Sequence, residues 1–293
     1  MGDSMSWEPE PFSRIIWRWK VPYKYRTIVS RANRLAHWVE YEAVKRGLRK
    51  CDVVHIHPRD LPQRVREIMK DGLVWLPIRT MKSVSGFAHK FYQPSSLDET
   101  LYYGVVAHSM DEAKAFLEAH QSRPCDHDTI GELLGYPKCC REFFCKTFPR
   151  GELDPVHLVD SSKGQDPMLC VSLRYFGLRI IPFFPCSFNC SKAKAFAEQW
   201  YKLMLEKDPF TAKGILELLT MPHKWSMVNA IIEVVTPLFI GICNGYVRYQ
   251  KAELYWKGDP EYWKKKVPLQ WHWYQYSLGK RPSIKELKSC MQS

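Results

Sequence analysis

Residues 135–140 read GYPKCC and residues 185–190 read PCSFNC, so two turn-forming segments each carry a pair of cysteines. We expect a helix to begin at each segment, because proline suits the first turn of a helix. The first turn also presents unpaired N–H groups and a partial positive charge, which favour thiolate over thiol. Thiolate is the form that binds metals or attacks substrates. The four candidate metal ligands are Cys139, Cys140, Cys186 and Cys190.

Packing alone does not readily explain the adjacent pair Cys139 and Cys140. Successive helical positions point about 100° apart, so both side chains cannot easily face one core. Four thiolates suit zinc and also an iron–sulfur cluster, and both cofactors remain open. The spacing is not that of a zinc ribbon or a ferredoxin. The other possibilities are catalytic or redox thiols without metal, and ordinary buried cysteines.

Two further side chains are candidates for proton transfer. Glu142 follows the adjacent cysteines and would lie near a metal held by them. His157 lies in a polar segment with Asp160 and Asp166, either of which could orient it as a general base. If the protein is an enzyme, we therefore expect Glu142 and His157 to be catalytic.

The composition is that of a globular protein of 293 residues, with 45% hydrophobic and 25% charged residues. We expect a basic N-terminal α/β region over residues 1–125 and a cysteine-cluster region over residues 126–293, unless the two form one continuous domain. Residues 1–12 show no secretory signal, and the apolar stretch 227–243 is interrupted by polar residues and proline. A cytoplasmic protein with reduced cysteines and no membrane span is expected.

The net charge of +12 is unevenly distributed. Residues 1–90 contain 18 Lys/Arg and 9 Asp/Glu, and residues 245–293 contain 10 and 4, whereas residues 91–244 contain 15 and 18. The two basic flanks also carry most of the tryptophans. Basic residues between aromatic residues can hold a phosphate backbone and stack on bases. Nucleic acid is therefore a possible partner; the alternative is a solvated basic surface with tryptophans in the core.

Hydrophobic periodicity predicts an α+β or α/β fold, a mixed sheet with flanking helices. Ser109 and Glu112 form a capping box. Asp128 or Thr129 is expected to cap a short helix, and Ser187 or Asn189 a longer one. The expected helices cover residues 26–50, 61–70, 110–120, 137–147 and 190–206, with a further short one opening at Pro282–Ser283. The expected strands cover residues 52–57, 73–78 and 101–108, with strand character over 173–184 and two strands within 237–255.

Several catalytic signatures are missing from the sequence. There is no phosphate-binding Gly-x-x-x-x-Gly-Lys-Ser/Thr loop, no Gly-x-Gly-x-x-Gly after a strand and no Gly-x-Ser-x-Gly elbow. A zinc deaminase is disfavoured, because Cys186 and Cys190 have the wrong spacing and no His-x-Glu precedes them.

The two cysteine segments resemble those of a poorly characterised family of archaeal and viral proteins. Its members pair a Gly-Tyr-Pro-x-Cys-Cys-x3-Phe element with a later Pro-Cys-Ser-x(2–3)-Cys element, here residues 135–144 and 185–190. This resemblance implies a site formed by the four cysteines, and it implies no reaction. The chain is also distantly similar to phage enzymes of 7-deazaguanine nucleobase metabolism and DNA modification. A vicinal-cysteine redox enzyme of queuosine metabolism is similar too, but its second cysteine pair is spaced more tightly.

Two functional hypotheses follow. The first is a metal-dependent enzyme acting on a nucleotide, a modified nucleobase or nucleic acid, and it requires a pocket beside Cys139 and Cys140. The second is a nucleic-acid-binding protein in which a closed four-cysteine zinc site only stabilises the fold. A structural assembly protein without a metal is a third possibility.

Overall fold

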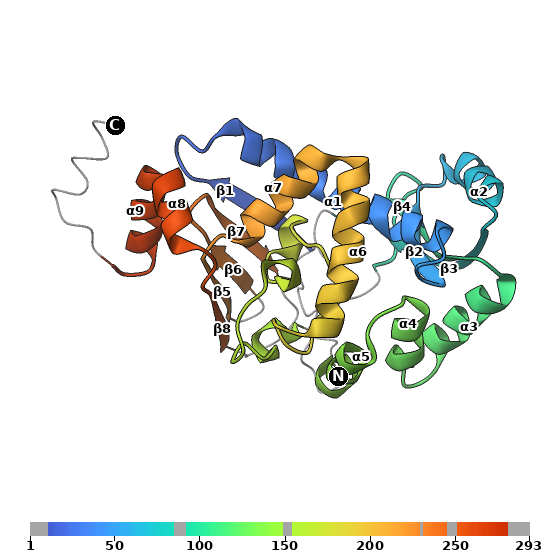
Figure 1. Cartoon of the computed structure of the whole chain (residues 1–293). Helices are drawn as coiled ribbons and strands as arrows, with labels where there is room; N and C mark the ends of the chain where they lie inside the picture. The colour runs from blue at the N-terminus through green and yellow to red at the C-terminus, as the bar shows by residue number, and fades with distance from the viewer. Residues whose placement is uncertain (1–10, 85–91, 149–153, 229–230, 245–250, 281–293) are drawn as a thin grey trace, which may run out of the picture.

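The computed structural model describes residues 11–84, 92–148, 154–228, 231–244 and 251–280. The predicted α+β fold is confirmed, and its strands form two separate antiparallel sheets instead of one mixed sheet. Figure 1 shows the two sheets at opposite ends of the molecule, with long helices between them. No helix in the described ranges is long and apolar enough to cross a membrane.

The small sheet has the strand order β2-β4-β3. Its strands are β2 (Cys51–Ile56), β3 (Val74–Lys82) and β4 (Thr100–Ala107). The central strand β4 is inserted between two strands that precede it in the chain, which explains how the short helix α2 (Leu61–Lys70) can connect them. The helix α3 (Met110–Gln121) packs against this sheet and buries Phe116.

The large sheet has the strand order β1-β7-β6-β5-β8 and combines β1 with four strands from the C-terminal half of the chain. β1 (Ser13–Trp17) pairs with β7 (Phe239–Asn244), whose side chains alternate between buried and half-buried. The other strands are β5 (His223–Val228), β6 (Ile231–Val235) and β8 (Lys251–Trp256). The sheet thus brings β1 against β7, although most of the chain lies between them in the sequence. The expected division near residue 125 stays a prediction.

Three helices pack on one another beside the large sheet and enclose the main core. They are α1 (Tyr23–Lys45), α6 (Ser191–Lys207) and α7 (Pro209–Leu219). The fully buried tryptophans of this core are Trp200, Trp225, Trp256 and Trp263. The core therefore accounts for two tryptophans of the C-terminal basic flank. The remaining helices are α4 (His127–Leu133), α5 (Lys138–Thr147), α8 (Pro260–Lys266) and α9 (Pro268–Ser277).

Some local predictions are wrong. Residues 173–184 form no strand: a 3₁₀ turn at Arg174–Phe176 ends at Gly177, which adopts φ +78°, and the rest is irregular. Gly177 and Pro182 interrupt this segment, and its apolar side chains are nevertheless buried in the main core. The cap of α4 is Asp126, whose side chain accepts the N–H of Thr129. The helix expected at Pro282–Ser283 lies outside the described residues.

The Ser109 half of the capping box before α3 is confirmed, because the Ser109 side chain accepts the N–H of Glu112. We expect Ser109→Ala to lower the free energy of unfolding by about 1 kcal/mol, since it leaves an N–H of the first turn without its acceptor. Urea denaturation measures this change. Ser30→Ala, on the exposed surface of α1, is the control and should change stability by less than about 0.5 kcal/mol. Equal losses in the two variants would contradict the capping argument.

Candidate metal centre and adjoining cleft

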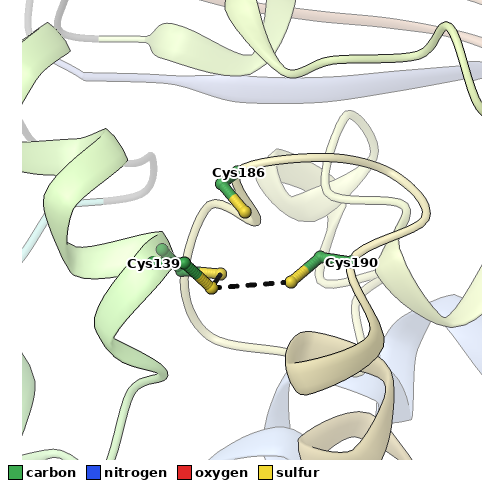
Figure 2. Close-up of side chains that lie close together, drawn as sticks. Cys139, Cys186 and Cys190 are labelled. Carbon is green, nitrogen blue, oxygen red and sulfur yellow. Dashed lines mark hydrogen bonds between the residues drawn. The ribbon is translucent and has the colours of Figure 1, made fainter.

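Four cysteines converge where the start of α5 meets the start of α6. The ligand atoms of Cys139, Cys140, Cys186 and Cys190 all lie within 4.8 Å of one another. The Sγ of Cys139 is 3.9 Å from that of Cys140 and 3.7 Å from that of Cys190. Figure 2 shows the labelled side chains pointing toward a common centre. These distances far exceed the S–S bond of about 2 Å, so the cluster consists of free thiols that could hold a metal ion.

The first pair is placed by the turn before α5. Pro137 is the N-cap of this helix, and its carbonyl accepts the N–H of Cys140 at 2.9 Å. Gly135 adopts φ +76° and lies against Arg49, where an added Cβ would come within 3.1 Å of the arginine's Cβ. Glycine is favoured at this position because it adopts positive φ without strain. The sequence Gly-Tyr-Pro therefore sets the direction in which the two thiols leave the chain.

The second pair is placed by a loop that ends at α6. Cys190 is itself the N-cap of α6, and its Sγ accepts the N–H of Ala193 at 3.5 Å. The expected caps Ser187 and Asn189 are therefore wrong. The loop is fixed at its centre by a parallel bridge between Asp160 and Ser187. Backbone hydrogen bonds therefore hold both of the segments that carry the cysteines.

The thiols differ in their tendency to ionise. Burial raises the pKa of Cys140, and burial together with the neighbouring thiols raises the pKa of Cys186 to about 12. Burial also opposes ionisation of Cys190, but the N–H of Ala193 and the neighbouring thiols outweigh it and lower its pKa. Four thiolates this close would repel one another, and a cation among them removes that repulsion. The cluster therefore has the electrostatic character of a cation site.

An apolar pocket of about 230 Å³ lies directly against the cluster. Cys140 forms part of its wall, and Phe144 and Phe184 contribute nearly parallel rings whose centroids are 6.2 Å apart. Its other lining residues are His127, Ile130, Gly131, Tyr136, Arg141, Pro182 and Phe183. The pocket that the enzyme hypothesis required beside the adjacent cysteines is therefore present.

A second pocket, of about 260 Å³, shares the wall formed by Tyr136 and residues 182–184 and is lined by charged side chains. Arg179 donates to Glu40 at 3.1 Å. Burial opposes ionisation of Glu40, but Arg179 and neighbouring cationic groups lower its pKa to about 2. Arg49 and Asp52 form an ion pair that is almost completely buried. We refer to these two adjoining pockets together as the cleft, with an apolar end and a charged end.

Tyr136 lies at the junction of the two pockets. Its ring packs on Phe183, with centroids 4.8 Å apart. Burial raises its pKa, and the charges of Arg49 and Glu40 act on its hydroxyl. No side chain or backbone group in the described ranges hydrogen bonds to this hydroxyl. The phenol therefore presents an unused donor to whatever occupies the cleft.

Neither predicted catalytic residue lines these two pockets. Glu142 is exposed and lies 4.0 Å from Lys138 on the same helix. His157 stacks on Trp225, and its Nδ1 is 3.1 Å from the carbonyl oxygen of Asp154. The carboxylates of Asp160 and Asp166 accept backbone N–H groups of their own turns. The catalytic roles of Glu142 and His157 stay predictions.

The charged end of the cleft was not predicted. Glu40 and Arg49 come from α1 and the turn after it, and Arg174 and Arg179 from the irregular segment before the second cysteine pair. The one available signal was Glu40, a carboxylate next to the apolar stripe of the α1 sequence. A charge at such a position needs a partner, but the sequence does not say which.

The fold and cluster define an α+β protein with a four-cysteine site that could bind metal. Residues 113–220 match a family described as "Protein of unknown function (DUF483)", and this segment contains all four cysteines. An "Uncharacterized protein" from Methanothermobacter thermautotrophicus is 32% identical over 107 residues, covering 33% of this chain and 51% of the relative. The chain thus spans about half the length of that relative. No solved structure matches the chain. These similarities support a relationship of the chain to a poorly characterised, archaeal-type family.

Proposed function

We propose that the four cysteines hold one zinc ion in a closed, structural site, and that the protein acts on a nucleotide or nucleobase bound in the adjoining cleft. The observation that carries this proposal is the position of residues 136–140. Tyr136 forms the centre of the cleft, and Cys140 belongs both to the cleft wall and to the cysteine cluster. An ion at the cluster would therefore fix the geometry of the ligand site.

The sulfur distances favour a single ion over an iron–sulfur cluster. Zinc bound tetrahedrally to four thiolates at about 2.3 Å places neighbouring sulfurs about 3.8 Å apart. The two distances from Cys139, 3.9 Å and 3.7 Å, agree with that edge. In a four-iron cluster each thiolate binds a different iron, so the sulfurs lie farther apart than around one ion. Zinc is the usual occupant of a closed four-cysteine site.

A closed site assigns the ion a structural role. Four protein ligands leave no coordination position for water or substrate. The ion would hold the start of α5 against the start of α6, and any chemistry would take place in the cleft beside it. Proton transfer would then take place in the cleft and not at the metal. Glu142 and His157 line neither pocket, so a loss of turnover in their alanine variants would be needed to assign them a catalytic role.

The cleft matches a ligand that is planar at one end and polar at the other. Phe144, Phe183 and Phe184 form the apolar wall, on which a heterocyclic ring can stack. The guanidinium of Arg174 lies 4.5 Å over the ring of Phe184, at the boundary with the charged end. Guanidinium groups bind phosphate and the polar edges of bases. A nucleobase stacked on the apolar wall would place its polar edge or phosphate beside the arginines of the charged end, which are already paired with Asp52, Glu40 and Asp154.

The variant Tyr136→Phe tests this assignment. It removes only a hydroxyl that has no partner in the described part of the protein, so the stability should be unchanged. We expect affinity for the bound nucleobase, nucleoside or nucleoside monophosphate to fall about three-fold to ten-fold, the usual loss for one hydrogen bond. Calorimetric titration of the full chain with a panel of these compounds measures the effect.

Tyr201→Phe is the matched control. Tyr201 is also half-buried and its hydroxyl also has no partner among the described residues, but it lines neither pocket of the cleft. It should bind ligand like the unaltered chain. The assignment is wrong if no compound of the panel binds, or if both tyrosine variants bind equally well.

A further inference from the structure

Two basic segments from opposite ends of the chain meet on one face, away from the cysteine cluster. The turn after β1 lies against α9, as Figure 1 shows at the end of the molecule that carries α8 and α9. Gln270 of α9 donates to the carbonyl oxygen of Trp19 at 3.0 Å. Arg18 donates to the hydroxyl of Ser277 at 3.1 Å. The two flanks that the sequence separates by more than 200 residues therefore form one surface.

This surface exposes large aromatic side chains. Trp19 is 69% exposed, Tyr23 79%, Trp273 48% and Tyr276 57%. We call these four residues the aromatic face. Trp273 and Tyr276 contact each other edge to face, with ring centroids 6.2 Å apart. Isolated exposed aromatic residues are common, but a group of four on two contacting segments marks a binding surface.

The surroundings of the aromatic face are basic. Residues 17–26 contain four Lys/Arg and no Asp/Glu, and α8, which follows Asp259 and contains Glu261, ends in Lys264, Lys265 and Lys266. Lys20 places its Nζ 4.6 Å over the ring of Trp19. The nearby acid Glu217 is already engaged, because Lys24 lies 3.4 Å and Lys266 3.8 Å from its carboxylate. The aromatic face is therefore bordered by positive charge.

We infer that the aromatic face binds single-stranded nucleic acid, with bases stacked on the rings and phosphates held by the lysines. Stacking on Trp and Tyr together with cations along the backbone is how proteins bind single strands without sequence preference. Duplex is a poorer match, since its bases are already stacked and α9 itself carries no Lys or Arg to place in a groove.

The test uses the full chain and a fluorescently labelled oligothymidylate of about 20 nucleotides. Anisotropy titrations compare the unaltered protein with Trp19→Ala/Trp273→Ala. We expect the double variant to bind at least about twenty-five-fold more weakly, since each stacking ring contributes about five-fold or more. Phe210→Ala removes an exposed aromatic residue (49%) at the start of α7 and should leave the affinity unchanged.

A second variant tests the charges independently. Lys264→Gln/Lys265→Gln should reduce the slope of log affinity against log salt by about one for each lysine removed. No binding at low salt, or an unchanged affinity in the tryptophan double variant, overturns the inference. So does a result in which this double variant loses self-association or binding to anionic lipid vesicles but binds the oligonucleotide normally. Tyr136→Phe lies in the cleft and should not affect this binding.

Discussion

Cys190→Ser is expected to abolish stoichiometric metal binding and to lower the free energy of unfolding by about 3–5 kcal/mol. The variant separates the two roles of this residue. Serine is a strong N-cap, so α6 keeps an acceptor for the N–H of Ala193. A serine hydroxyl is a poor ligand for zinc compared with a thiolate, and loss of a structural ion is among the largest effects that one substitution produces. Metal analysis of the purified protein, with chemical denaturation, measures both quantities.

Cys145→Ser is the matched control for the cysteine substitution. Cys145 lies in the same helix as Cys139 and Cys140, is half-buried and takes no part in the cluster. The control should retain one equivalent of metal and most of the stability. If Cys190→Ser kept its metal, or if the unaltered chain bound none under anaerobic purification, the zinc proposal would be refuted and the four cysteines would be ordinary thiols without a bound ion.

Arg49→Met is expected to lower the free energy of unfolding by about 3–5 kcal/mol at neutral pH. Arg49 is 1% exposed and Asp52 7%, so the substitution leaves a carboxylate buried without its cation. It also removes the donor to the carbonyl oxygen of Glu40 at 3.1 Å. The double variant Arg49→Met/Asp52→Asn removes the charge and keeps an acceptor for the N–H of Val53. It should recover most of the loss.

The effect of Arg49→Met should depend on pH. Burial raises the pKa of Asp52 to about 6 even though Arg49 opposes the shift, so the pKa rises further once Arg49 is gone. A carboxyl group with a raised pKa in the folded state stabilises the fold when protonated, and that contribution is lost as the pH rises. The deficit should therefore be largest above about pH 7 and smallest below about pH 5. A deficit that is the same at every pH, and that the double variant fails to recover, would mean that lost packing is the cause.

The sequence was sufficient to predict helices where a hydrophobic pattern is bounded by residues that start or end a helix. The helix predicted over residues 61–70 is found with the same bounds, and the capping box fixed the start of α3 at Met110. The cysteine cluster was predictable for a similar reason. Adjacent thiols at a turn are unusual for packing, so residue identity alone brought the two segments together in the prediction.

Predictions failed where the outcome depends on distant partners. No strand was predicted at β5 or β6, because an apolar run does not reveal which strand it will pair with. Residues 173–184 have the composition of a strand, yet the fold uses them as an irregular core segment. The charged end of the cleft was not predicted for the same reason. Glu40, Arg49 and Arg179 read as surface charges until the fold places them together.

The pairing of β1 with β7 also limits the order in which parts of the protein can fold during synthesis. Ser13 pairs with Cys243 and Trp17 with Phe239, so β1 has no partner in the large sheet until β7 has been synthesised. The four cysteines of the cluster and the whole of the small sheet are synthesised before β7. A nascent chain can thus bring its four cysteines together and form its small sheet before β1 has a partner. Closure of the large sheet is then a late step, because it joins β1 to strands that are synthesised much later.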